Sequence, residues 1–274
     1  MTAGVPRIVP LFSSDKELHQ HPAVAFLHIP KTAGTWFTTF LTLHFPLEQV
    51  APPLYGATKD TNFCDAEKKL FAGHFRYSSV NTPLQMLYMT FLRDPISRTA
   101  SQYRSFHNNA NFTDAWRATA SSEGVEAIEW AQSVSYDEFV RSDNSLILAH
   151  IKNAQTGYLT SFLDFDHPSF LNSAIENLGE MFFLGVQEFS DESLALFRYQ
   201  TGTSLQWQPT REQRNVSETY DVNLTRSGRD RLYELVEHDL KLYEAGLLLF
   251  KERLVHVTAA AASHRGCSNE RAIY

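Results

Sequence analysis

The stretch "FLHIPKTAGTWF" (26–37) indicates the fold class, because an apolar run ends in a short turn and a second apolar pattern starts directly after it. The run before the turn is typical of a buried strand, and the pattern after it is typical of a helix that begins near Gly34. A small-residue turn between a strand and a helix collects free backbone amides, which makes it a cradle for an anion. Lys31 adds a full positive charge, so the stretch predicts an anion site at a strand end.

The same order of strand and helix recurs further along the chain. The apolar run "MLYMTFL" (86–92) precedes a helical pattern from about Asp94, and "MFFLGV" (181–186) precedes one from about Asp191. A shorter run, "KLFAG" (69–73), adds another strand. Strands that alternate with helices form parallel sheets with crossover connections, so we expect an α/β protein with a central parallel sheet flanked by helices.

A single domain is expected to occupy residues 23–257. Apolar residues from Leu232 to Leu247 recur at helical spacing, which predicts one long amphipathic helix packed on the sheet. Residues 1–22 form an N-terminal extension in this interpretation, and the small and polar residues of 258–274 are typical of a frayed, flexible tail.

Composition narrows the classes of partner. The chain of 274 residues is 43% hydrophobic and has a formal charge of -7, which argues against broad attraction to nucleic acid or to an anionic membrane. No run approaches the roughly 18 consecutive apolar residues of a membrane span, and the first residues lack the layout of a signal peptide. We therefore expect a cytoplasmic protein without a membrane span. The two cysteines, Cys64 and Cys267, suggest neither a disulfide framework nor a metal site.

A second motif, "MTFLRDPISRTASQY" (89–103), repeats the layout of a strand end followed by a helix start. Arg93 stands at the end of the strand, and the Asp-Pro pair after it is typical of a helix N-terminus. Ser101 lies about two helical turns later, so a long arginine and a serine hydroxyl can converge on one phosphate. Two anion sites at neighbouring strand ends predict one ligand with two anionic ends.

Simpler interpretations exist for both motifs. The first turn could be an ordinary strand-to-helix connection with Lys31 in solvent, and Arg93 could pair with a nearby carboxylate. Arg98 and Arg104 are predicted to form a solvated helix face. The two motifs together favour the anion sites, because two neighbouring sites can bind the two anionic ends of one ligand.

The motifs resemble those of a known family. "HIPKTAGT" is similar to the 5′-phosphosulfate loop, and "LRDPISRTASQY" to the 3′-phosphate motif, of sulfotransferases that use 3′-phosphoadenosine 5′-phosphosulfate (PAPS). The resemblance is to the carbohydrate type in particular, related to heparan sulfate 2-O-sulfotransferases. Further similar stretches are "AGHFRY" (72–77), "KNAQTGYL" (152–159) and "FFLGVQEFSDESLALF" (182–197). The resemblance runs from about residue 23 to about 250 and implies a P-loop NTPase-like sulfotransferase fold.

The resemblance also implies an activity and a set of donor contacts. The enzyme would transfer the sulfuryl group of PAPS in line to a hydroxyl of a carbohydrate or another small acceptor, without a metal. Lys31 would contact the sulfonate or the bridging oxygen, and Arg93 with Ser101 would grip the 3′-phosphate. The implied donor-binding residues are Lys31, Thr32, Ala33, Gly34, Thr35, Trp36, Arg93, Ser101 and, on a closing loop, Arg214.

His74 is the expected base, because the related enzymes place a histidine in a similar Gly-His step and a histidine near its ordinary pKa takes up a hydroxyl proton at neutral pH. His28 competes for this role but is expected to be a core residue of its strand. Glu188 could act as a base or orient the acceptor, although capping of the helix after it is the favoured interpretation. The residues assigned to the acceptor side are Arg76, Asn153, Gln155 and Glu188.

Two other function classes are alternatives. A catalytically silent nucleotide-binding module would be expected to lose the lysine or the base, and both are present. A P-loop kinase needs the order G-x-x-x-x-G-K-[ST], whereas the lysine here precedes the glycine. Sulfuryl transfer is therefore the leading hypothesis.

Overall fold

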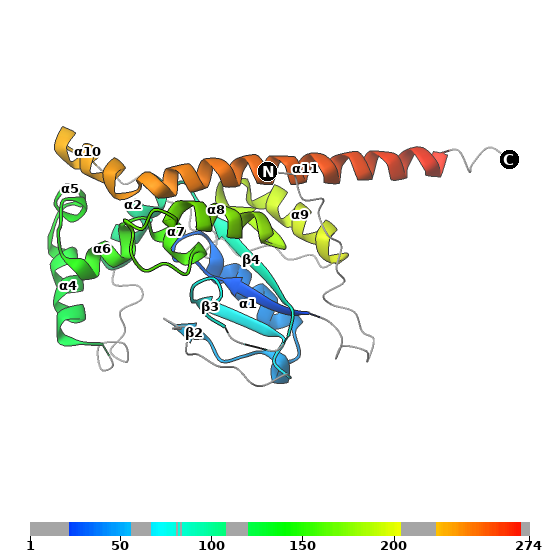
Figure 1. Cartoon of the computed structure of the whole chain (residues 1–274), viewed down its shortest axis with the longest axis horizontal. Coiled ribbons are helices and arrows are strands. Elements are labelled where there is room, and N and C mark those ends of the chain that lie inside the picture. Colours follow the sequence, from blue (N-terminus) through cyan, green and yellow to red (C-terminus); the bar gives the residue numbers. More distant parts are fainter. Residues whose placement is uncertain are drawn as a thin grey trace.

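The computed structural model describes residues 22–55, 67–80, 82, 84–107, 120–203 and 223–269 (Figure 1). Arg214, the predicted closing-loop residue, and all but the last residue of the predicted N-terminal extension lie outside this part of the chain. In the part that is described, no helix is both long enough and apolar enough to cross a membrane.

Five strands form one sheet, and every pairing between them is parallel. The spatial order is β2-β3-β1-β4-β5, which places β1 in the centre. This architecture confirms the predicted α/β fold with a central parallel sheet. The strands are β1 (Ala23–Leu27), β2 (Leu54–Tyr55), β3 (Leu70–His74), β4 (Met86–Leu92) and β5 (Phe183–Val186).

The central strand fixes where a ligand can bind. All five residues of β1 are apolar and inaccessible to solvent, as expected for a strand covered on both faces. The chain first builds β2 and β3 on one side of β1 and then crosses to the other side to build β4 and β5. In open sheets of this kind, ligands bind beyond the carboxyl ends of the strands where the direction changes. Here that point lies at the ends of β1 and β4.

Helices α1 (Gly34–His44) and α9 (Ser190–Thr201) cover one face of the sheet. Phe37 of α1 is the centre of this packing, because its ring centroid lies 5.0 to 5.5 Å from those of four other phenylalanines. Aromatic rings in such edge and offset contacts stabilise a core beyond the area that they bury. The four are Phe26, Phe91, Phe183 and Phe197.

Helices α8 (Phe170–Glu180) and α11 (Glu237–Asn269) cover the other face, with α11 running along the molecule at the top of Figure 1. Gly246 permits the close approach of α11, since a Cβ at this position would lie 2.5 Å from the side chain of Leu92. Leu92 and Leu184 point to this face, because side chains alternate along a strand and their neighbours belong to the phenylalanine cluster. Together these layers form the sheet core.

A second apolar cluster, the helical core, is formed by helices that lie between β4 and β5 in the sequence and by the helix that precedes α11. Phe139 and Ile147 are at its centre and are almost inaccessible to solvent. Helix α7 (Ala154–Leu159) follows this region and contacts α8 and α11. The contributing helices are α2 (Pro95–His107), α4 (Ser122–Ser133), α5 (Tyr136–Val140), α6 (Ser145–Ile151) and α10 (Arg226–Leu235). Two 3-10 helices lie outside this core, η2 (Leu47–Gln49) and η3 (Gln187–Phe189).

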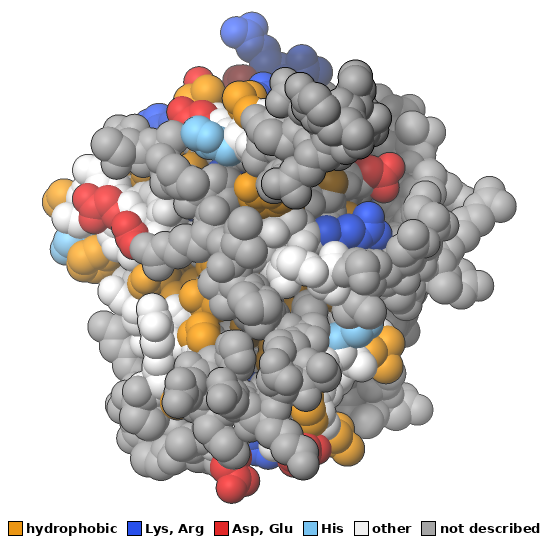
Figure 2. Space-filling model, turned by 90° about the vertical axis from the view of Figure 1, so that its right-hand side faces the viewer, with side chains coloured by type: hydrophobic (Ala, Val, Ile, Leu, Met, Phe, Trp, Pro, Cys, Tyr) orange, Lys and Arg blue, Asp and Glu red, His pale blue; other side chains and the backbone are white. Residues whose placement is uncertain are grey.

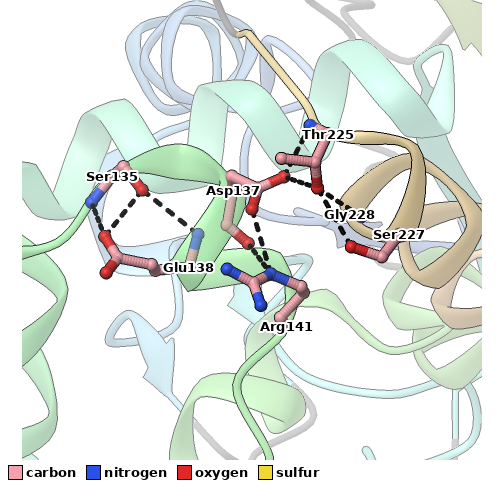
Figure 3. Close-up of polar contacts among 7 residues, drawn as sticks. All are labelled: Ser135, Asp137, Glu138, Arg141, Thr225, Ser227 and Gly228. Atoms are coloured by element: carbon pink, nitrogen blue, oxygen red, sulfur yellow. Dashed lines mark hydrogen bonds and ion pairs between the residues drawn. The ribbon is translucent and has the colours of Figure 1, made fainter.

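Polar contacts fix the starts of α5 and α10 (Figure 3). Ser135 and Glu138 form a capping box, in which each side chain accepts the backbone N–H of the other residue. Thr225, the N-cap of α10, donates its N–H and its hydroxyl to Asp137 Oδ1 at 2.8 and 2.7 Å. Arg141 bonds the other oxygen of Asp137 at 3.0 Å. These contacts hold α10 against α5.

The C-terminal helix differs from its prediction in two ways. The predicted single helix is interrupted at Val236, which separates α10 from α11. Helix α11 also continues to Asn269, beyond the predicted domain boundary at residue 257, so the first part of the predicted frayed tail is helical. The apolar spacing concealed the interruption, because the residues before it pack in the helical core and most of those after it pack in the sheet core.

Candidate functional site

Three strand ends bring the central predicted residues together. Lys31 lies shortly after β1, His74 is the last residue of β3, and Arg93 directly follows β4. The Nδ1–H of His74 donates to the carbonyl of His28 at 2.7 Å. Nη1 of Arg93 donates to the carbonyl of Lys31 at 3.1 Å. These two contacts join the ends of β3 and β4 to the loop after β1.

The loop after β1 has the backbone of an anion cradle. Lys31 and Ala33 both adopt left-handed conformations, with φ of 70° and 75°, and α1 begins at the next residue, Gly34. Left-handed residues in a turn bring nearby amides to one side, and the helix N-terminus adds free amides and its dipole. The hydroxyl of Thr32, in contrast, is buried and donates to the carbonyl of Ile29 at 2.9 Å. This hydroxyl therefore closes the loop.

His28 fills the space beneath the loop. A Cβ on Gly34 would lie 2.1 Å from Cδ2 of the His28 ring, so only glycine fits at the start of α1. The ring also stacks on that of Phe26, with centroids 5.9 Å apart. Burial, reinforced by His74 and Lys31, lowers the pKa of His28 to about 3, so the ring is neutral at pH 7. His28 directly follows β1 and is partly exposed, so it borders the sheet core without belonging to the strand.

Lys31 is a cation that lacks a bonded carboxylate among the described residues. Its side chain is partly buried. Burial and then the positive charges of Arg93, Arg104 and Arg98 lower the pKa of the Lys31 ammonium. Because these cations repel one another, a ligand with several negative charges stabilises the whole cluster.

Arg93 is held at both its backbone and its side chain. The residue is only 7% exposed, and its guanidinium contacts the carbonyl of Lys31. Its backbone N–H and carbonyl bond the carboxamide of Gln155 at 3.0 and 2.8 Å. Burial lowers the pKa of Arg93, and the carboxylate of Glu188 acts in the opposite direction. Ser101 lies about two turns along α2 and is largely buried.

The prediction that Arg98 and Arg104 form a solvated face is wrong. Arg98 is completely buried, and its Nη2 donates to the carbonyl of His150 at 3.0 Å. Arg104 is only partly exposed, and its charge acts on Lys31 and Arg93. Because α2 packs against α4, α5, α6 and α11, the side of the helix that the sequence pattern assigned to solvent is covered.

His74 has the tautomer that a general base needs. A carbonyl only accepts, so the Nδ1 that faces the carbonyl of His28 must carry the proton, and Nε2 carries the lone pair. Burial lowers the pKa of His74 below 6.5, the bond to His28 opposes this shift, and the charge of Lys31 lowers the pKa further. The ring is therefore neutral at pH 7 and can take up a proton at Nε2.

The assignment of Asn153 and Gln155 to the acceptor is wrong, because the fold itself uses both amides. Oδ1 of Asn153 accepts the N–H of His238 at 2.9 Å, at the start of α11. Gln155 is completely buried against the backbone of Arg93. Helix α7 begins inside the molecule, between the end of β4 and the start of α11, so neither side chain is open to a second substrate.

Glu188 caps a helix other than the one predicted. Its Oε1 accepts the N–H of Asp94, just before α2, at 2.9 Å, and its Oε2 accepts the hydroxyl of Tyr243 at 3.0 Å. The favoured interpretation, a cap on α9, is therefore corrected. The observed contact joins the end of β5 to the end of β4, next to Arg93.

Three further predicted residues differ in their access to a ligand. Arg76 is partly buried, and its Nη1 donates to the carbonyl of Phe162 at 3.0 Å. Thr35 is exposed in the first turn of α1. Trp36 is buried and packs its indole edge-on against Phe91 in the sheet core. The indole therefore belongs to the sheet core.

His150 is a neighbour of the site that sequence reasoning missed. This residue of α6 is exposed, and its ring centroid lies 5.2 Å from that of Phe106. The surrounding protein, and then the charges of Arg98 and His74, lower the pKa of His150 to about 4. No motif marks this histidine, because its position depends on how α6 packs onto α2.

The cations of the site form a local cluster on an acidic protein. On the face drawn in Figure 2, the acidic and basic side chains that are coloured lie scattered between apolar ones. The formal charge of the chain is -7. Within the described ranges, no group of three histidine, cysteine or acidic side chains is arranged to hold a metal ion.

Comparison with known proteins identifies the family. The model of the sulfotransferase family matches residues 18–244. Heparan-sulfate 6-O-sulfotransferase 3 of Homo sapiens and its Mus musculus counterpart are each 25% identical, over 92% of this chain and 64% of their own length. Heparan-sulfate 6-O-sulfotransferase 1-B of Danio rerio is 25% identical over 87% of this chain and 68% of its own length.

The family match extends over most of the chain, although the chain spans only 64% of the length of the human and mouse relatives. These relatives are named for the 6-O position, whereas the motifs resemble the 2-O type. The matched residues include the loop after β1, the end of β3 and the start of α2. The chain belongs to the sulfotransferase family.

Proposed function

We propose that the protein transfers the sulfuryl group of PAPS to a hydroxyl of a carbohydrate, with His74 as the base. The observation that carries the proposal is the pair of cations Lys31 and Arg93, which lie at adjoining strand ends and are linked through the Lys31 carbonyl. In the described part of the chain, neither cation is bonded to a carboxylate. PAPS suits this pair because it has a sulfonated 5′ end and a 3′-phosphate. Membership of the family supports PAPS as the donor.

The residues have separate tasks in this proposal. The Lys31 ammonium and the amides of residues 32–35 stabilise the charge that develops on the oxygen leaving toward the nucleotide. Arg93 and Ser101 hold the 3′-phosphate and thereby place the 5′ end in line with the acceptor. His74 takes the acceptor's proton at Nε2, while its Nδ1–H stays bonded to a backbone carbonyl.

The proposed acceptor class comes from the relatives, which are named for 6-O-sulfation of heparan sulfate. A glycan hydroxyl would then approach Nε2 of His74. Arg76 and His150 are the proposed acceptor contacts, because both are at least partly accessible to solvent. Arg76 lies two residues after His74 in the sequence, and the charge of His74 acts on His150. Donors of this kind can bond glycan hydroxyls without a broad basic surface.

The test is a sulfuryl-transfer assay with PAPS and a panel of unsulfated and N-sulfated heparosan chains. Sulfated product is measured by mass spectrometry, together with release of 3′-phosphoadenosine 5′-phosphate (PAP). Lys31→Ala should lower the rate at least about 100-fold, because a charge-stabilising donor is lost. Lys241→Ala is the matched control, because this exposed lysine of α11 pairs with Glu237 and should leave the rate unchanged.

If the wild-type protein binds PAP but gives no product with any glycan, carbohydrate sulfation is contradicted. That outcome would support a catalytically silent nucleotide-binding module. Equal rates for Lys31→Ala and Lys241→Ala would show that the loop after β1 is not the site of transfer.

A further inference from the structure

We propose that Gln155 is a positioning residue for the phosphate-binding arginine, because its carboxamide holds both polar groups of the Arg93 backbone. This inference rests on the proposed function, in which Arg93 binds the 3′-phosphate. It assigns to Gln155 a task that does not require contact with either substrate.

The two hydrogen bonds between Gln155 and Arg93 extend the hydrogen bonding of β4 by one residue beyond the sheet. Pairing between β4 and β5 ends at Leu92 and Val186, so Arg93 is the first residue of this chain segment beyond the strand. Nε2 of Gln155 donates to the Arg93 carbonyl at 2.8 Å, and Oε1 accepts the Arg93 N–H at 3.0 Å. The side chain of Gln155 thus replaces a neighbouring strand at a place where the sheet has ended. Both peptide groups that flank the Arg93 Cα are fixed in this way.

Gln155 is itself fixed from α11. Oδ2 of Asp239 accepts the backbone N–H of Gln155 at 3.1 Å, and Oδ1 accepts the N–H and hydroxyl of Thr156 at 2.8 and 2.7 Å. Asp239 and Gln155 are both 0% exposed. In return, Oδ1 of Asn153 accepts the N–H groups of His238 and Asp239. The starts of α7 and α11 therefore cap each other and leave the Gln155 carboxamide facing the end of β4.

The consequence for a ligand is a pre-organised guanidinium. Gln155 holds the backbone of Arg93, and the carbonyl of Lys31 holds one nitrogen of its side chain at 3.1 Å. An arginine fixed at both ends loses little further freedom when it binds a phosphate. Without the carboxamide, Arg93 would have to be ordered at the moment of binding, so affinity for the 3′-phosphate should fall while contacts to the 5′ end stay intact.

The experiment measures the ratio of affinities for PAP and ADP by calorimetric titration without magnesium. Gln155→Met keeps the length of the side chain but removes both bonds to Arg93. We expect this variant to lower the PAP-to-ADP affinity ratio about tenfold. Gln200→Met is the matched control, because Gln200 is another buried glutamine that donates to a backbone carbonyl, that of Phe182 before β5. The control should leave the ratio within about twofold of wild type.

The ratio separates positioning from a merely structural role. A loss of stability alone lowers the folded fraction for both nucleotides equally, so it leaves the ratio unchanged. An unchanged ratio in Gln155→Met overturns the inference, and so does an equal fall of the ratio in Gln200→Met. If the methionine variant does not fold, Gln155→Asn takes its place. This variant keeps the amide but is one methylene shorter, and the same fall of the PAP-to-ADP affinity ratio is expected. A wild-type protein that does not prefer PAP would instead contradict the proposed function itself.

Discussion

Two aspartates, Asp137 and Asp239, make the same contact in different parts of the molecule. Oδ1 of Asp137 accepts the N–H and hydroxyl of Thr225 at 2.8 and 2.7 Å (Figure 3). Oδ1 of Asp239 accepts the same two groups of Thr156 at the same distances. Each aspartate therefore fixes the start of a helix that is distant from it in the sequence.

The surroundings of the two carboxylates differ. At Asp137, Arg141 bonds the second oxygen, and the hydroxyl of Thr225 is the main reason that the pKa of Asp137 lies below its ordinary value. Asp239 is completely buried, and burial raises its pKa, while the charge of buried Arg98 opposes the shift. Asp137 forms a direct ion pair with Arg141, whereas the charge of Arg98 acts on Asp239 without a direct ion pair among the described residues.

Only one of the two aspartates is connected to the candidate site. The contacts of Asp137 lead to Arg141, which is exposed at the surface. Those of Asp239 lead through Gln155 to Arg93 and from there to the loop after β1. In the proposed function, the same capping contact therefore affects the site only where the capped helix also holds a residue that contacts the site.

Removing the buried carboxylate should give the largest effect. Asp239→Ala deletes three hydrogen bonds and leaves the charge of Arg98 buried without the carboxylate that acts on it. We expect the free energy of unfolding to fall by about 3–5 kcal/mol, measured by urea denaturation. The matched variant is Asp137→Ala, which should lose clearly less. Equal losses in the two variants would remove the distinction between the clusters.

Removing the base tests whether the network serves catalysis. His74→Ala should lower turnover about 10²–10⁴-fold, because no side chain then takes the proton from the hydroxyl of the carbohydrate. The affinity for PAP should stay near that of wild type. His256→Ala, an exposed histidine of α11, is the control. Since the pKa of His74 is lowered, the wild-type rate should stay constant at neutral pH and decline only below pH 6.5, as the ring becomes protonated. A decline that begins above pH 7 would exclude His74 as the base.

Removing Arg93, which the contacts of Asp239 reach, should have a smaller effect, and this effect is on nucleotide binding. Arg93→Ala should weaken PAP binding about 10–100-fold but change ADP binding less than about threefold, because the 3′-phosphate contact is the one contact to the nucleotide that is lost. Arg141→Ala, the arginine bonded to Asp137, should change neither affinity. Titration calorimetry measures both. Equal weakening of PAP and ADP by Arg93→Ala would show that Arg93 does not recognise the 3′-phosphate.

The smallest effect is a difference in pH dependence. The folded-state pKa of Asp137 is lowered, so its contribution to stability is present above its ordinary pKa and is lost as pH falls through the folded value. The pKa of Asp239 is raised, so its contribution is present below its ordinary pKa and is lost as pH rises through the folded value.

The measurement compares wild type with Asp137→Asn and with Asp239→Asn, by chemical denaturation between about pH 3 and pH 7. The stability advantage of wild type over Asp137→Asn should shrink toward low pH. Its advantage over Asp239→Asn should grow over the same range. Parallel curves for the two variants would mean that burial does not separate these carboxylates.

Local patterns predicted four of the five strands, all except β2, and the loop after β1. Strand β4 has the predicted bounds 86–92, because its apolar run is continuous and a helix start follows immediately. The convergence of Lys31, His74 and Arg93 also followed from local motifs, since parallel strands bring their carboxyl ends to one edge.

Contacts between distant segments account for what was missed. Asp239 bonds residues more than 80 positions away in the sequence, and nothing local marks such a partner. For the same reason Gln155 was assigned to a substrate, although its carboxamide faces a strand end. Arg98 was assigned to solvent because the pattern of α2 shows polar residues but not the helices that cover them.

Calorimetric titration of the wild-type protein with PAP, ADP and ATP in the absence of magnesium tests the two proposed anion sites. Two anion sites at the ends of β1 and β4 predict that PAP binds at least about tenfold more tightly than ADP, because only PAP has a phosphate for Arg93. A preference for ATP, or no binding of PAP, would show that these two sites do not bind a 3′-phosphorylated nucleotide.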